Sequence, residues 1–255
     1  MNDAVLFEAR DDGIAVITLN RPEIRNCLTA QVRAGLARAW ARFERDPLLR
    51  IAILTGAGDR AFCAGGDLKE MVDTGMRVPP RDMFALPYDT VELSKPTIAA
   101  VNGVAYAGGW MIAQACDLCV ASTTARFAIT EVKVGRSAPW AAPLIHMIPQ
   151  RIMMEIMLTG KPITARRAYE VGLVNRIAEP DELFTAAVEL ATEVLAGAPL
   201  SVRAARETVM LATEMGRSAA LQAARNASEL CYNSDDAQEG PRAFAEKRSP
   251  RWQGR

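Results

Sequence analysis

The chain has 255 residues, half of them hydrophobic, and its 30 basic and 30 acidic side chains cancel. Such a chain can bury a substantial core, and its balanced charge argues against partners held by a strong one-signed field, such as nucleic acid or an anionic membrane. The N-terminal MNDAVLFEARDD is no signal peptide and no apolar run is long enough to span a bilayer, so we expect a cytoplasmic protein.

The opening segment VLFEARDDGIAVITLN alternates apolar and polar residues on both sides of Asp12-Gly13, which predicts a hairpin of two strands. From Thr29 to Asp46, apolar residues recur at helical spacing and Pro47 closes the run, which predicts a helix. Its arginines fall outside the apolar positions, so we expect them on a solvated face.

The order strand, glycine-containing loop, helix then occurs twice. IAILTG (51–56) is an apolar strand, AFCAGGD (61–67) a glycine-containing loop, and DLKEM begins a helix capped by Asp67. TIAAV (97–101) is another strand, NGVAYAGG (102–109) another such loop, and WMIAQA another helix. Two further strands, LCVAS and ARFAI, precede TEVKVG, and helical patterns dominate from Arg151 onward. The sequence therefore predicts an α/β core followed by a helical C-terminal portion.

A strand that runs through a glycine turn into a helix leaves N–H groups at the helix start without intrahelical partners. Glycine lets a ligand approach these donors, and neither loop matches the patterns that bind nucleotide phosphates. Two converging loops that offer one N–H each can form an oxyanion hole, although tight structural turns would give the same residues.

Cysteine and histidine offer little chemistry. The five cysteines, odd in number and scattered, indicate a reducing compartment. Cys116 and Cys119 form a CxxC without a second ligand pair, so we interpret them as buried structural thiols and predict no metal site. His146 lies in the apolar LIHMI beside no nucleophile motif, which disfavours a catalytic triad. The cysteines are Cys27, Cys63, Cys116, Cys119 and Cys231.

In combination, AFCAGGDLKEM, KPTIAAVNGVAYAGG, ACDLCVAS, ARFAITEVKVG, LTGKPITARRAYEVGLVNRI and FAEKR resemble the enoyl-CoA hydratase/isomerase family, the crotonase superfamily. The resemblance covers nearly the whole chain. It implies a spiral of repeated β-β-α units over residues 1–199 and a helical region over 200–255 that completes the coenzyme A site and mediates trimerisation, as a trimer or a dimer of trimers. It implies an acyl-CoA substrate and no separate cofactor.

The resemblance also implies the site. The peptide N–H groups of Gly66 and Gly108 would hold the thioester oxygen, and Glu131 would be a catalytic carboxylate. Coenzyme A would run past Arg25, along Ala64, Gly66, Asp67, Leu68 and Lys69, and toward Phe244 and Lys247 of the C-terminal helix. Arg25 and Lys247 can equally be ordinary solvated charges.

Hydratases of this family use a second glutamate, and its position is occupied here by Met111. A thioether cannot exchange a proton, whereas shifting a double bond from the 3,4 to the 2,3 position needs only one base. The AGG followed by two apolar residues and the downstream SAPW also resemble 3,2-enoyl-CoA isomerases. We therefore favour an isomerase, with Met71, Trp110, Met111, Pro139 and Trp140 forming a dry acyl pocket that raises the pKa of Glu131.

Two alternatives stay open. A hydratase could use a replacement acid from the region after the first glycine loop, where Glu70, Asp73, Asp82, Asp89 and Glu92 lie. A non-catalytic acyl-CoA-binding protein would keep the fold without turnover, although the retained Glu131 argues for chemistry. The acyl chain itself is not specified by any of these residues.

Overall fold

The structure, a computed structural model, describes residues 3–255. Its strands are β1 (Val5–Ala9), β2 (Ile14–Leu19), β3 (Ile51–Gly56), β4 (Ala61–Cys63), β5 (Thr97–Val101), β6 (Val104–Tyr106), β7 (Leu118–Ser122), β8 (Arg126–Ala128), β9 (Ile163–Thr164) and β10 (Arg176–Ala178). Its α-helices are α1 (Ala30–Arg45), α2 (Leu68–Thr74), α3 (Gly108–Gln114), α4 (Gln150–Thr159), α5 (Ala165–Glu170), α6 (Leu183–Leu195), α7 (Pro199–Glu214), α8 (Arg217–Tyr232) and α9 (Asp236–Ala245). Short 3₁₀ helices are η1 (Pro22–Ile24), η2 (Arg81–Met83), η3 (Glu131–Val134) and η4 (Pro139–His146).

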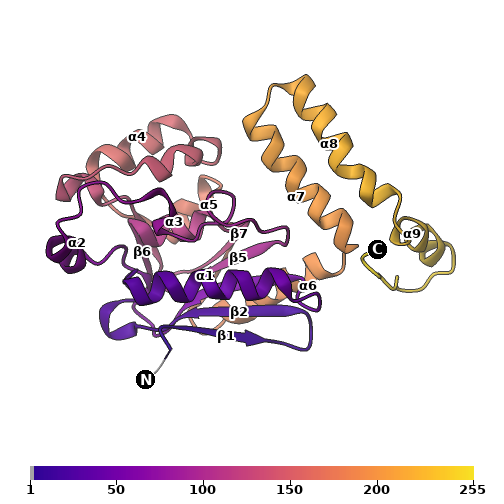
Figure 1. The fold of residues 1–255 in the computed structure, drawn as a ribbon, viewed down its shortest axis with the longest axis horizontal. Coiled ribbons are helices and arrows are strands. Elements are labelled where there is room, and N and C mark those ends of the chain that lie inside the picture. The colour runs from indigo at the N-terminus through magenta and orange to yellow at the C-terminus, as the bar shows by residue number, and fades with distance from the viewer. Residues whose placement is uncertain (1–2) are drawn as a thin grey trace.

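Two sheets share the strands in alternation. The six-stranded sheet has the order β1-β2-β3-β5-β7-β10, and the four-stranded sheet has the order β4-β6-β8-β9. From β3 to β8 each strand of the larger sheet is followed by one of the smaller sheet, and α2 and α3 follow the first two such pairs (Figure 1). This is the predicted spiral of β-β-α units, and it brings the ends of β4 and β6 side by side because those strands pair in parallel.

The core lies on both faces of the six-stranded sheet. Alternate side chains of a strand point to opposite faces, so Ile51 and Ile53 pack toward α6 while Ala52 and Leu54 belong to the larger cluster that includes α1 and α3. Parallel strands buried on both faces are apolar throughout, which explains the unbroken IAILTG and TIAAV.

The opening hairpin and the first helix are confirmed, with β1 antiparallel to β2 and the Thr29 side chain capping α1. The two predicted glycine loops are each shorter than expected, because β4 contains the first three residues of one, β6 contains residues 104–106 of the other, and α3 already begins at Gly108. LCVAS and ARFAI do not pair with each other, since β7 lies in the larger sheet and β8 in the smaller.

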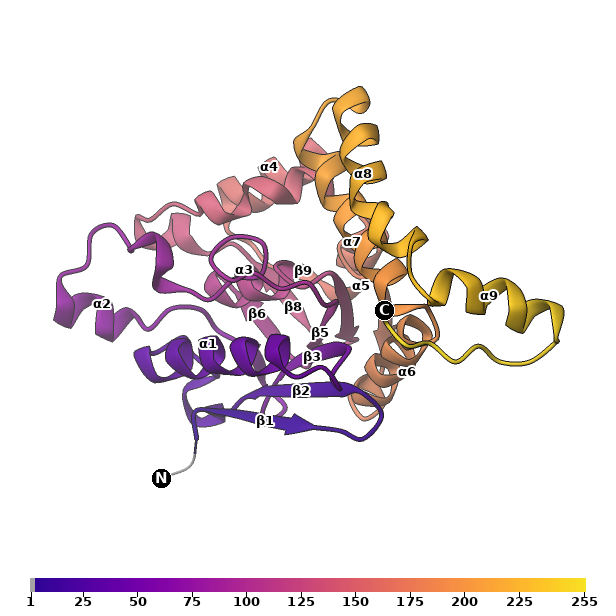
Figure 2. The same ribbon diagram turned by 45° about the vertical axis from the view of Figure 1, so that its right-hand side comes forward.

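The C-terminal helices stand apart from the spiral. The hairpin of α7 and α8 projects from the sheets, and α9 lies at the opposite end of the molecule from α2 in both views (Figures 1 and 2). Within residues 3–255 no single helix meets the length and hydropathy of a membrane span, and one pair, α6 with α7, meets them only jointly across a 105° bend.

Candidate active site

The two glycine turns converge on one point. An ideal Cβ placed on Gly108 would lie 3.6 Å from the Gly66 nitrogen, and one on Gly109 would lie 2.0 Å from the carbonyl oxygen of Cys63. On the other side, Leu28 donates its N–H to the Gly65 carbonyl at 2.8 Å. The chain after β4 is therefore held between the loop before α1 and the start of α3, and at Gly109 only glycine permits this approach.

Both turns present free donors. Across residues 3–255, neither the N–H of Gly66 nor that of Gly108 donates to a protein acceptor. Ala107 has φ 49° and ψ −122°, a conformation that alanine rarely adopts, and it turns the chain from β6 directly into the first turn of α3. Paired N–H groups of this kind suit an oxygen that develops negative charge.

The carboxylate of Glu131 lies at the first residue of η3, in the segment after β8. Its Oε1 accepts a hydrogen bond from the indole Nε1 of Trp140 at 2.8 Å, whereas its Oε2 is buried without a partner. Burial raises the pKa of Glu131, and the hydrogen bond from Trp140 opposes the rise. The expected increase in the pKa of this carboxyl is thus confirmed, and its free oxygen resembles that of a base awaiting a proton.

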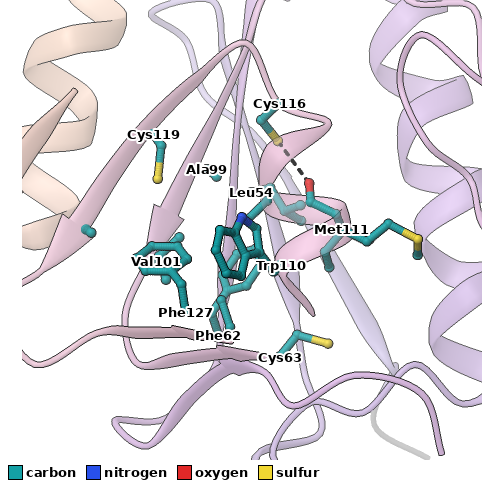
Figure 3. Close-up of a cluster of buried hydrophobic side chains, with 14 of the residues drawn as sticks. Leu54, Phe62, Cys63, Ala99, Val101, Trp110, Met111, Cys116, Cys119 and Phe127 are labelled. Carbon is teal, nitrogen blue, oxygen red and sulfur yellow. Dashed lines mark hydrogen bonds between the residues drawn. The ribbon is translucent and has the colours of Figure 1, made fainter. Parts of the chain in front are cut away.

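Met111 and Trp110 point to different sides of α3 (Figure 3). Trp110 is fully buried and packs edge-on against Phe127, with ring centroids 5.6 Å apart, in the core between the strands. Met111 extends away from it and is 4% exposed. The structure therefore does not bring Trp110 together with Met111 in one pocket wall, and it shows no carboxylate at position 111 or at its neighbours on α3.

A model of the enoyl-CoA hydratase/isomerase family matches residues 9–255, a range that includes both glycine turns and Glu131. The chain belongs to this family. Among solved structures, an enoyl-CoA hydratase from Mycobacterium tuberculosis H37Rv superposes with a TM-score of 0.91 at 40% identity over 100% of both chains. The enoyl-CoA hydratase EchA1 from Mycobacterium marinum gives 0.91 at 39% identity, again over 100% of both.

Two relatives are similar over nearly their full length. The (E)-benzylidenesuccinyl-CoA hydratase of Thauera aromatica is 38% identical over 94% of this chain and 96% of its own. The carnitinyl-CoA dehydratase of Salmonella arizonae is 38% identical over 96% and 97%. The family and fold predicted from sequence are thus confirmed, while the names of these relatives do not specifically support an isomerase.

The residues expected to bind coenzyme A in this family divide into two groups. The first group lies in the chain around Gly66. In it, the Asp67 carboxylate caps α2 by accepting hydrogen bonds from the N–H groups of Lys69 and Glu70 at 2.9 and 3.4 Å. Leu68, Lys69 and Arg25 are exposed and Ala64 is half-buried. Phe244, 88% exposed, and Lys247 lie in and just after α9, on the far side of the molecule, so one chain does not bring them to the glycine turns.

The acyl-pocket candidates other than Trp110 lie on three elements, α2, α3 and η4. The terminal methyl of Met71 lies over Gly66, 2.7 Å from where a Cβ would stand. Trp140 is half-buried beside Glu131, and Pro139 precedes it, exposed, as the first residue of η4. The Met71 thioether over Gly66 and the Trp140 indole beside Glu131 give the site a largely apolar lining.

None of the proposed replacement acids is buried. Glu70 forms an ion pair with Arg33, with Nη2 2.7 Å from Oε1 and Nη1 3.0 Å from Oε2, which lowers the pKa of Glu70. The remaining acids, which are all exposed, are Asp73, Asp82, Asp89 and Glu92. Asp89 forms an ion pair with Arg81 at 3.4 Å. A rescue of the hydratase mechanism by these side chains therefore finds no support in their positions.

Two arginines hold the segment after the first turn. Arg33 was expected on a solvated face of its helix, which is wrong, because its side chain is only 15% exposed and is paired with Glu70; Arg136 was not singled out from the sequence. Arg33 of α1 donates to the Leu28 carbonyl at 2.7 Å as well as pairing with Glu70. Arg136, in the turn after η3, donates to the carbonyl oxygens of Met76 at 3.3 Å and Arg77 at 2.9 Å. Their role was hidden because carbonyl acceptors carry no sequence signal.

The cysteines lie where structural thiols are expected. Cys116 and Cys119 are buried, and burial raises the pKa of Cys119 and of Cys63 to about 12. Within the described part of the chain, no cluster of three or more His, Cys, Asp and Glu side chains is arranged to hold a metal ion.

Proposed function

We propose that this family member isomerises 3-enoyl-CoA to 2-enoyl-CoA thioesters with Glu131 as the single proton carrier. The observation that carries the proposal is the buried, unpartnered Oε2 of Glu131 in a site whose second family glutamate is replaced by Met111. A raised pKa fits a carboxylate that must take a proton and return it.

The chemistry follows from the two turns. The thioester oxygen accepts hydrogen bonds from the N–H groups of Gly66 and Gly108. Glu131 takes a proton from C2 through Oε2, and the electron pair of that C–H bond spreads through the dienolate onto the thioester oxygen. The same carboxyl group then returns the proton at C4, so the double bond ends between C2 and C3 and no water is consumed. Met111 and Met71 disfavour water beside the dienolate.

Hydration is the second candidate, and the names of the relatives favour it. The similar proteins from Thauera aromatica, Salmonella arizonae and Mycobacterium tuberculosis are named as hydratases or a dehydratase. In that case Glu131 would exchange the C2 proton, and water would have to be oriented without a carboxylate at position 111.

A side-by-side assay tests the proposal. Purified enzyme is given 3-hexenoyl-CoA and crotonyl-CoA in separate assays. The rate at which 3-hexenoyl-CoA becomes a conjugated thioester is compared with the rate at which crotonyl-CoA loses its conjugation by hydration. We expect isomerisation to exceed hydration by about 100-fold or more, the usual contribution of one acid–base group. Faster hydration than isomerisation would overturn the isomerase and favour the second candidate, and binding without turnover of either would favour a non-catalytic acyl-CoA-binding protein.

Met111→Glu tests why hydration would be slow. If the site differs from a hydratase only by this side chain, the variant gains hydration of crotonyl-CoA and loses part of its isomerisation. Met111→Gln is the matched control, because it adds a polar group of similar size that cannot act as a base at neutral pH. An equal gain in both variants would attribute the change to wetting of the pocket instead of acid–base chemistry.

We also infer a homotrimer or a dimer of trimers in which C-terminal helices complete a neighbour's coenzyme A site. The position of Phe244 and Lys247 far from their own glycine turns supports this, as do exposed apolar side chains on α7 and α8, among them Val209, Leu221 and Leu230. Light scattering coupled to gel filtration gives the oligomeric state, and a monomer that is fully active would contradict the inference.

A further inference from the structure

The two oxygens of Glu131 are held in unlike surroundings. Oε1 accepts the indole N–H of Trp140 at 2.8 Å, and Oε2 is buried with no partner. A carboxylate held at one oxygen cannot turn freely, and hydrogen bonds to ionised groups are stronger than those between neutral groups. Trp140 therefore selects Oε2 as the oxygen that is free to exchange a proton.

Trp140 is itself held by α3. The side-chain amide of Gln114 donates through Nε2 to the Trp140 carbonyl at 2.6 Å. Gln114 follows Met111 by three residues, a spacing that places two side chains on the same side of a helix. Pro139 at the start of η4 restricts the backbone just before Trp140. The helix that lacks the second glutamate thus remains connected to Glu131 through two hydrogen bonds.

We propose that Trp140 is a positioning residue for Glu131, fixed in turn by Gln114, and that this chain of two hydrogen bonds is how α3 controls the base in the absence of a second carboxylate. The inference deepens the proposed function and rests on it for the role of Glu131 as the base. It does not depend on whether the proton moves in isomerisation or in hydration.

A role for Trp140 as a pocket-lining side chain alone predicts a different result. If Trp140 only lines the pocket, its replacement by phenylalanine changes substrate fit and raises KM. If it positions Glu131, the loss of its N–H leaves the carboxylate free to rotate and removes the interaction that opposes the rise in its pKa. The kcat then falls, and the acidic limb of the pH–rate profile moves to higher pH because the base must be ionised.

The first test compares Trp140→Phe with Trp252→Phe. Trp252 also donates one indole hydrogen bond, to the Ala196 carbonyl at 2.8 Å, but in the C-terminal segment. We expect Trp140→Phe to lower kcat by about 10- to 100-fold with KM little changed and to move the acidic limb upward. The limb should stay in place in Trp252→Phe. An unmoved limb with a changed KM in Trp140→Phe would overturn the positioning role.

The second test needs neither turnover nor a substituted tryptophan. In TROSY spectra of the ¹⁵N-labelled wild type, the Trp140 indole N–H resonance should shift as Glu131 titrates, and Glu131→Gln should abolish that shift. An indole resonance that does not respond to pH in the wild type would overturn the proposal. Because no substrate is present, this result separates failure of the positioning role from failure of the proposed reaction.

Gln114→Met tests the connection to α3. The variant keeps the length of the side chain and loses its N–H donor, so we expect a smaller fall in kcat, of about 3- to 10-fold, with the limb moved in the same direction as in Trp140→Phe. Gln222→Met, which removes an amide donor to Asn226 on exposed α8, is the control. A profile identical to that of the wild type would remove Gln114 from the proposal.

Discussion

The turn before α2 and the turn before α3 offer the same kind of backbone donor, yet their surroundings differ. None of the residues of α2 is buried, and its anchors are two arginines that come from other elements. In α3, every residue from Gly108 to Ala113 is buried, and Gln114 contacts Trp140. One half of the site is therefore adjustable and the other is fixed by packing, which separates shaping of the substrate pocket from positioning of the base.

The largest expected effect comes from Glu131, the base that the fixed half positions through Gln114 and Trp140. Glu131→Gln should lower turnover by about 1,000-fold and leave acyl-CoA affinity within a few-fold of the wild type, because the amide fills the same space but cannot take a proton. Steady-state rates and calorimetric titration with a substrate analogue measure the two quantities. An unchanged rate would mean that the base lies elsewhere, including on the adjustable side.

Alanine scanning of the glycines compares the two turns directly. Gly109→Ala should cost more than about 3 kcal/mol of unfolding free energy, because its Cβ would lie 2.0 Å from the Cys63 carbonyl oxygen. Gly66→Ala should cost less than about 1 kcal/mol, since the only atom within 3 Å is the flexible end of Met71. Urea unfolding measures both, and equal costs would contradict the contrast between a fixed and an adjustable half.

The ion pair that anchors α2 should matter less. Glu70→Gln is expected to cost at most about 1 kcal/mol of stability and to raise KM a few-fold with kcat unchanged. Arg33 lowers the pKa of Glu70, so the stabilisation is present above the ordinary carboxyl pKa and is lost as the pH falls through the lowered value. Asp89→Asn, which removes an exposed pair on the same segment, is the control. An effect on kcat as large as that on KM would show that α2 also positions the base.

The smallest expected effect is on thermal stability. The raised pKa of Glu131 means that its ionised form is disfavoured in the folded protein, so its cost appears as the pH rises above the ordinary carboxyl pKa. Glu131→Gln should accordingly raise Tm by about 1–3 °C at alkaline pH and by less in acid. A variant less stable than the wild type at every pH would contradict the cost of burying this ionised carboxylate.

Local pattern and family resemblance were sufficient to predict the fold. The alternation around Asp12-Gly13 and the apolar spacing from Thr29 to Asp46 specify their elements without long-range information. The short strands β4 and β6 were not recognised within the glycine loops, because three apolar residues before a glycine carry no distinct period. Their pairing is a tertiary property.

The candidate site was only partly predictable for the same reason. Glu131 and the glycines could be assigned from motifs, but the bond between Trp140 and Glu131 depends on how η4 folds back toward η3. Trp110 and Met111 are adjacent in sequence and both are buried, so pattern alone could not show that their side chains leave α3 in different directions. Helix geometry places consecutive side chains about 100° apart, and tertiary packing decides what each of them contacts.

The hydrogen bonds from Arg136 to the segment after α2 bear on how the range of substrates could change between related enzymes. Its acceptors are the main-chain carbonyl oxygens of Met76 and Arg77, so the contact survives almost any change of side chain at those two positions. Substitutions there can reshape the surface of this segment without loosening its attachment to the element that carries Glu131. In the proposed reaction, mutation of this segment would let the site accept new acyl groups while the geometry around Glu131 is unchanged.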